Sequence, residues 1–275
     1  MGITFGNIKL LEDYDLIGRQ KRILDFGSSN LYEATSEQII NFVEKHNPQP
    51  PRNLKTWAAK FAEGTGVDAN GVNTNGSFAG ELFEMADMKY DSIDIASGYN
   101  TTIVDLNTQV LPADMVGSYD SVLNFGTSEH ILNQMNTFAA VHAATKAGGM
   151  IMHSVPSVGY VDHGYFCYTS RFFFDMAGYN EYELVDLWFE QTEGSENLFA
   201  SARQYQTYFP TLKERLARID TEKRERSLDL LQVPVISLSV VYRKVNEKPF
   251  MGMVETSTSV GDVSAQVLGS YAAAT

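Results

Sequence analysis

Seven short apolar runs recur along the chain, and longer stretches with helical periodicity lie between several of them. Short strands that alternate with amphipathic helices are typical of a mostly parallel sheet covered by helices on both faces. The runs predict strands over residues 22–27, 90–97, 101–107, 119–126, 150–156, 182–189 and 233–245. The sequence therefore predicts an α/β fold built around one sheet.

The interval between the first two predicted strands is much longer than a single connecting helix. The segments "TSEQIINFVEKH" and "LKTWAAKFAEG" predict helices, the first with a Ser/Thr cap, and a loop leads into a third helix before residue 89. We therefore expect a helical insertion or cap over residues 31–80. A second helical insertion is expected over residues 190–232, within a single domain of residues 1–255. The polar segment 256–275 predicts a flexible tail.

Charge and composition narrow the classes of partner. The 275 residues are 44% hydrophobic, which is enough for a large core, and the formal net charge of −13 repels phosphate backbones, so no nucleic-acid partner is expected. The single Cys167 allows no internal disulfide, and the N-terminus lacks the pattern of a secretion signal, so we expect a cytoplasmic protein. No apolar run approaches the roughly 18 residues of a membrane span.

Acidic residues lie at or near the ends of the first three predicted strands: Asp25, Asp94 and Asp105. Ligands of open α/β sheets bind at the carboxyl ends of the strands. Carboxylates accept hydrogen bonds from hydroxyl and amino groups and repel phosphate, so these acids favour a nucleoside-like ligand without a pyrophosphate. The alternative is that each aspartate only forms a turn with its own backbone.

The glycine pattern after the first strand disfavours a dinucleotide. A GxGxxG motif needs three glycines, so that the backbone approaches the pyrophosphate at a helix N-terminus. Only Gly27 is present, with Ser29 and Leu31 where further glycines are expected, and the acid of the second predicted strand, Asp94, lies 69 positions after Asp25 instead of about 20.

Five segments together resemble the successive motifs of class I S-adenosylmethionine-dependent methyltransferases: "ILDFGSSN", "SIDI", "TIVDLN", "YDSVLNFGTSEHI" and "AGGMIMHSVP". They occur in the family's order over about residues 20–190. The resemblance implies a Rossmann-like sheet of seven mostly parallel strands with an antiparallel final hairpin, and S-adenosylmethionine as cofactor. The chain departs from the usual first motif, acid-x-Gly-x-Gly-x-Gly, because it keeps only the acid and the first glycine.

The resemblance also implies which residues bind the cofactor. The first strand and its loop hold the methionine part and the sugar, the acid of the second strand holds the ribose hydroxyls, the acid after the third lies near the adenine amino group, and the fourth strand and its turn line the other side. In that order these positions are Asp25, Gly27 and Ser28, then Asp94, then Asp105 with Leu106, and finally Asn124, Phe125 and Gly126.

Two histidines are candidate catalytic residues. His163 lies in an aromatic-rich segment after the fifth strand, between Asp162 and Gly164, and a loop histidine beside an acid suits a general base. His130 is the second candidate. The alternative for His130 is that it packs beneath a helix over residues 127–149, with Glu129 at the positive end of that helix and two glycines ending it.

No metal is expected. Some family members that methylate quinone precursors bind a divalent ion through a Glu-x-x-Glu-His run, and Gly126 occupies the position of the first acid here.

The resulting hypothesis is a methyltransferase that acts on a small-molecule or glycan-like acceptor, with oxygen as the expected target atom. Two alternatives stay open: a catalytically silent Rossmann-like interaction protein, and a nucleotide- or NAD-dependent oxidoreductase. Helices rich in aromatic residues and methionine would also permit a homodimer.

Overall fold

The computed structural model describes residues 2–64, 66–67, 73–160, 162–191, 199–201, 235–252 and 264–266. The predicted second insertion (190–232) and the predicted tail (256–275) lie almost entirely outside the described residues. No described helix has both the length and the apolar character needed to cross a bilayer.

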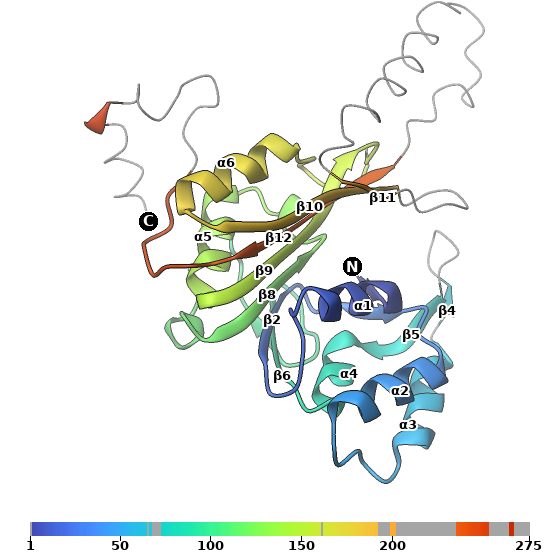
Figure 1. Cartoon of the computed structure of the whole chain (residues 1–275). Helices are drawn as coiled ribbons and strands as arrows, with labels where there is room; N and C mark the ends of the chain where they lie inside the picture. The colour runs from blue at the N-terminus through green and yellow to red at the C-terminus, as the bar shows by residue number, and fades with distance from the viewer. Residues whose placement is uncertain are drawn as a thin grey trace, which may run out of the picture.

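The main sheet has eight strands in the order β11-β10-β12-β9-β8-β2-β6-β7 (Figure 1). Neighbouring strands from β9 to β7 run parallel, whereas β12 runs antiparallel to both β9 and β10. The expected Rossmann-like α/β fold, its seven strands and its antiparallel final pair are therefore confirmed, and β11 adds an eighth strand at one edge. The strands are β2 Arg22–Phe26, β6 Lys89–Asp94, β7 Thr101–Ile103, β8 Tyr119–Phe125, β9 Thr145–Val158, β10 Glu183–Gln191, β11 Phe199–Ser201 and β12 Ile236–Arg243.

Helices cover both faces of this sheet. On one face, α5 (Gln134–Ala144) and α6 (Ser170–Asn180) pack on a first core that includes Leu24 and Phe26. On the other face, α1 (Phe5–Asp13), α2 (Ser36–His46), α3 (Leu54–Ala62) and α4 (Ala79–Met85) contribute to a second core that includes Ile23. Successive side chains of a strand point to opposite faces, so the run "RILDF" supplies both cores.

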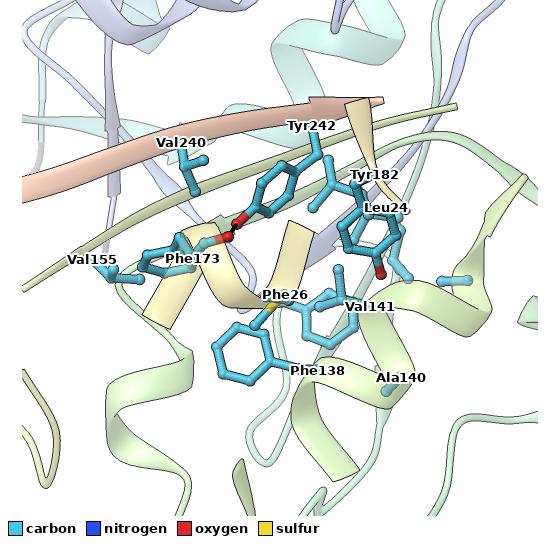
Figure 2. Close-up of a cluster of buried hydrophobic side chains, with 14 of the residues drawn as sticks. Leu24, Phe26, Phe138, Ala140, Val141, Val155, Phe173, Tyr182, Val240 and Tyr242 are labelled. Carbon is cyan, nitrogen blue, oxygen red and sulfur yellow. Dashed lines mark hydrogen bonds between the residues drawn. The ribbon is translucent and has the colours of Figure 1, made fainter. Parts of the chain in front are cut away.

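The first core is rich in aromatic side chains, and one of them carries a buried hydrogen bond. The hydroxyl of Tyr242 on β12 donates to the backbone carbonyl of Phe173 on α6 at 2.6 Å (Figure 2). Helix α6 carries the consecutive residues Phe172–Phe174, of which Phe173 is fully buried and Phe174 is 41% exposed. Three consecutive helical residues cannot all face one side, because successive residues differ by about 100° around the axis.

The segment after β2 holds helices, as expected, and also strands that the sequence did not predict. A four-stranded sheet in the order β1-β3-β5-β4 combines β1 (Gly2–Thr4), β3 (Asn30–Tyr32), β4 (Gly66–Val67) and β5 (Asn73–Phe78). Strand β5 lies where a loop was expected, because "NTNGSF" has low strand propensity and pairs through distant residues. The predicted cap of α2 is confirmed: Thr35 and Gln38 form a capping box.

The helix expected over residues 127–149 is wrong at both ends. A single 3₁₀ turn, η2 (Ser128–His130), comes first, and α5 begins only at Gln134, where the Asn133 side chain accepts a hydrogen bond from the amide of Asn136. Strand β9 starts at Thr145, so the two glycines lie inside a strand. The pairing of β8 with β9 shifts register there, which is typical of a β-bulge.

Candidate functional site

The loops after β2 and β8 lie at the point where strand order reverses. From β2 the sheet continues through β6 and β7 in one direction, and β8 and β9 lie in the other. Such a switch point is where ligands of open α/β sheets bind. Gly27 and Gly126 follow directly after β2 and β8 with φ of 95° and 72°, a backbone region that favours glycine. The Thr127 hydroxyl donates to the carbonyl of Phe26 and joins the two loops.

Asp25 lies beneath the first loop and is fully buried. Its Oδ2 accepts hydrogen bonds from the Ser29 amide at 3.1 Å and from the Tyr90 hydroxyl at 2.9 Å, whereas within the described residues Oδ1 has no hydrogen-bond partner. Burial raises the pKa of Asp25 to about 6. The carboxyl group therefore fixes the shape of the Gly27 loop from below.

Asp94 ends β6 and joins the loop after β6 to the loop after β2. Its Oδ2 accepts a hydrogen bond from the Ser28 amide at 3.3 Å, and its Oδ1 accepts one from the Ala96 amide at 3.0 Å. The Ser28 hydroxyl in turn accepts a hydrogen bond from the Tyr99 amide at 2.9 Å. A carboxylate has about four acceptor positions, so Asp94 keeps capacity for further hydroxyl donors. Ile95, the next residue, is 74% exposed.

Asp105 and Leu106 lie beyond the end of β7, and their side chains have internal roles. The Asp105 carboxylate accepts hydrogen bonds from the Asn107 amide at 2.9 Å and the Thr108 hydroxyl at 3.3 Å, which is the turn that the sequence left open as an alternative. Hydrogen bonding by the Asn107 amide lowers the pKa of Asp105. Leu106 is 3% exposed and belongs to the first core.

Asn124 and Phe125, at the end of β8, also point into the protein. Asn124 is buried: its Oδ1 accepts from the Ser128 amide at 3.1 Å, and its Nδ2 contacts the Ser128 hydroxyl and His153 Nδ1, both at 2.9 Å. Phe125 is 6% exposed and packs in the second core. These two residues therefore hold the loop that carries Gly126.

The two predicted catalytic histidines lie together, and a third residue lies between them. The Nε2 atom of His163 is 3.3 Å from Oε1 of Glu129, and the Nε2 atom of His130 is 3.9 Å from the same oxygen. The centroids of the two imidazole rings are 4.9 Å apart. We refer to Glu129, His130 and His163 as the Glu–His cluster.

Backbone contacts bring the His163 loop onto Glu129. The carbonyl oxygen of Glu129 accepts hydrogen bonds from the amides of Tyr165 at 2.8 Å and Phe166 at 3.3 Å. A Cβ atom on Gly164 would lie 2.9 Å from Cγ of Glu129, so the loop needs glycine at this position to approach so closely. His163 is therefore positioned by the contact of its own loop with Glu129.

The side chains of the cluster differ sharply in exposure. The Glu129 side chain is 0% exposed, and those of His130 and His163 are 39% and 42% exposed. Within the described part of the chain, neither carboxylate oxygen of Glu129 has a hydrogen-bond partner. Burial raises the pKa of Glu129 to about 7 and lowers the pKa of both histidines.

The sequence analysis missed Glu129 as a site residue, because it placed this acid at the start of a helix, where it would interact with the positive end of the helix. The available signal was its position beside His130, directly after the fourth strand of the predicted sheet. The structure brings Asp25, Gly27, Ser28 and Asp94 together as one group and the Glu–His cluster as another.

The chain was compared with known families, curated proteins and solved structures. No protein-family model matches the sequence, and no curated protein matches it. Among solved structures, phosphoethanolamine N-methyltransferase 2 of Haemonchus contortus in complex with S-adenosyl-L-methionine is 12% identical, with a TM-score of 0.43 over 88% of this chain and 52% of its own. A SAM-dependent methyltransferase of Archaeoglobus fulgidus is 13% identical, with a TM-score of 0.41 over 87% and 94% of the two chains. The [4+2]-cyclase SpnF is 10% identical, with a TM-score of 0.43 over 88% and 81%.

The chain thus spans about half the length of the Haemonchus contortus enzyme. Fold alone does not determine activity, so the function has to be argued from the residues of this chain.

Proposed function

We propose that this chain is an S-adenosylmethionine-dependent methyltransferase that acts on a hydroxyl group of a small-molecule or glycan-like acceptor. The observation that carries the proposal is the junction of the loops after β2 and β6 at the switch point, where Asp94 binds the amide of Ser28. This junction provides a carboxylate with spare acceptor capacity beside a glycine loop, which suits a ribose with two adjacent hydroxyls.

The residues around this junction fit the rest of the cofactor. S-adenosylmethionine supplies an electrophilic methyl group on a positively charged sulfur, which a lone pair of the acceptor displaces. Gly27 permits close approach to the backbone, and the exposed side chain of Ile95 provides an apolar surface for a nucleobase. The net charge of −13 favours a cation over an anionic ligand. We assign direct contact to Asp94, Ser28, Gly27 and Gly126, and a supporting role to Asp25, Asn124 and Phe125.

The Glu–His cluster is the proposed acceptor site. It follows β8, and its third member lies in the segment after β9, both at the same edge of the sheet as Asp94. The two imidazoles are exposed, so they face a bound acceptor, whereas Glu129 lies behind them. Oxygen is the proposed target atom, because a hydroxyl must lose its proton and positioned acid–base groups accelerate such a step by about 10²–10⁴-fold.

Two alternative functions have weaker support. A dinucleotide oxidoreductase would place the pyrophosphate at a helix N-terminus directly after the glycine loop. Here the chain continues into β3, where Leu31 is fully buried, and α2 begins only at Ser36. A silent interaction protein has no need for a buried carboxylate without hydrogen-bond partners, and such a group destabilises the fold.

Calorimetric titration with S-adenosylmethionine and S-adenosylhomocysteine tests the proposal. We expect the wild type to bind both, and Asp94→Ala to weaken binding by at least about tenfold, equivalent to about 1.4 kcal/mol. Asp91→Ala is the matched control, because Asp91 lies on the same strand and pairs with Arg22 instead. If the wild type binds neither compound, the proposed function is wrong. Equal losses in the two variants would refute the role of Asp94.

A further inference from the structure

The strongest unexplained feature of the molecule is the charge balance of the Glu–His cluster. Glu129 is completely buried, and within the described residues its carboxylate has no hydrogen bond and no ion pair with lysine or arginine. Transfer of an unpaired carboxylate into the protein interior is strongly unfavourable. A buried carboxylate of this kind is normally paired with a cation or coordinates a metal.

Two neutral donors converge on that carboxylate from separate segments. The Nε2 atoms of His130 and His163 both approach Oε1 of Glu129, yet neither contact has hydrogen-bond geometry. One donor atom from each of the three residues can be chosen so that all three lie within 4.8 Å of one another. Zinc binds imidazole nitrogen and carboxylate oxygen at about 2.0–2.2 Å, so atoms that share one ion lie roughly 3.0–3.5 Å apart.

The distance of 3.3 Å between His163 Nε2 and Glu129 Oε1 already lies in that range. The distance of 3.9 Å between His130 Nε2 and the same oxygen is slightly longer, and a small movement of the His130 side chain would shorten it enough. His130 is partly exposed, so its ring has room to turn. We propose that Glu129, His130 and His163 bind one divalent transition-metal ion. Two histidines and one carboxylate form the donor set of catalytic zinc sites and of iron sites with open coordination positions.

The expectation that no metal binds rested on the missing first acid of the Glu-x-x-Glu-His run. His163 lies 33 positions after His130 and supplies the third donor from another loop, which spacing along the sequence cannot reveal. Glu129 and His130 are adjacent in the chain, whereas His163 lies on a separate loop. The close contact of Gly164 with Glu129 brings this loop, and with it His163, next to the other two residues.

The exposed side of both imidazoles leaves open positions of the ion facing solvent. An acceptor hydroxyl bound there loses its proton to solvent more readily, because a metal ion lowers the pKa of a bound oxygen. This role rests on the proposed function, and in it the histidines act as ligands while the ion activates the hydroxyl. The binding of the ion itself does not depend on the cofactor.

Metal titration of the chelator-treated, untagged protein tests the inference without any activity measurement. We expect one Zn²⁺ per chain by calorimetry, and with Co²⁺ a visible absorption spectrum of a nitrogen- and oxygen-ligated ion. Glu129→Gln, His130→Gln and His163→Gln should each weaken Zn²⁺ binding by at least about tenfold, since each removes one of three ligands.

The matched control is His46→Gln. His46 also pairs through Nε2 with a glutamate, Glu12, but among the residues that the structure describes no third histidine, cysteine or acid joins this pair as a possible metal ligand. We expect His46→Gln to leave Zn²⁺ affinity unchanged. His163 lies in an exposed loop, so we expect His163→Gln to keep the wild-type fold. Circular dichroism checks this, so that a loss of Zn²⁺ affinity can be attributed to the missing ligand.

The inference is overturned if the wild type binds no Zn²⁺, or if the folded His163→Gln variant keeps full affinity. It is equally overturned if His46→Gln and His163→Gln lose the same affinity. Failure of metal binding with intact binding of S-adenosylmethionine would leave the proposed methyltransferase function standing, so the two failures are distinguishable.

Discussion

Replacement of Asp25 by asparagine tests the buried carboxyl group beneath the glycine loop. Burial raises the pKa of Asp25 from 3.8 to about 6, and this group is completely buried. The folded state therefore holds the proton more tightly than the unfolded state does. The contribution to stability is fully present below about pH 3.8 and is lost as the pH rises to about 6.

A rise of about two pKa units corresponds to about 3 kcal/mol in total. The part that falls between about pH 5 and about pH 7.5 is about 1.4 kcal/mol. We expect the wild type to lose this amount relative to Asp25→Asn over that range, measured as the free energy of unfolding in urea by circular dichroism. The asparagine carbonyl can still accept the hydrogen bonds from Ser29 and Tyr90, so the loop keeps its shape.

Two further variants sharpen this measurement. Tyr90→Phe removes a donor that lowers the pKa of Asp25, so its pH dependence should be steeper than that of the wild type. Asp114→Asn, which removes one exposed carboxylate, is the control for the loss of a single negative charge. The reasoning is refuted if the difference between the wild type and Asp25→Asn is the same at both ends of the pH range.

Two other predictions concern the loops of the site. Gly27→Ala places a side chain at a φ of 95°, which should lower the free energy of unfolding by about 1–3 kcal/mol and weaken binding of S-adenosylmethionine; unchanged calorimetric affinity would argue against contact at this loop. Asn124→Ala removes buried hydrogen bonds to Ser128 and His153 and should lower the free energy of unfolding in urea by roughly 2 kcal/mol. A stability equal to that of the wild type would mean that Asn124 does not hold the loop.

The central strands were predictable because a strand that is buried on both faces has a continuous apolar sequence. Strand β8 has six buried residues out of seven, and its predicted range differs from the structure by one residue at the C-terminus. Strand β9 was less predictable: it begins five residues before the predicted run, in "TKAGG". That extension depends on backbone pairing between Gly148 and Lys244 and between Lys244 and Gly149, which local propensity does not encode.

The two groups of site residues also differ in how well the sequence predicts them. The contact between Asp94 and Ser28 follows from parallel strands whose carboxyl ends meet at one edge, so an acid there predicts a ligand site. The contact between Glu129 and His163 depends on how one loop folds over another, and helical periodicity misplaced the start of α5 and with it the environment of Glu129. Asp105 also lies near a strand end, but its carboxylate forms a local turn. The position of an acid at a strand end therefore does not by itself distinguish a ligand contact from a turn.

Substitutions of residues that serve function and of residues that serve the fold should change the free energy of unfolding differently. Asn124 has its polar atoms paired inside the protein, so its loss should lower stability and disturb the loop that carries Glu129. Glu129 is a buried carboxyl group without a hydrogen bond among the described residues, and burial raises its pKa to about 7. An amide of the same shape cannot carry a charge, so Glu129→Gln should not lower the stability of the metal-free protein above about pH 7, even though it weakens metal binding. Residues kept for function at the expense of stability show this opposition. If Glu129→Gln instead destabilises the metal-free chain as much as Asn124→Ala does, the carboxylate supports the fold through contacts other than a bound cation.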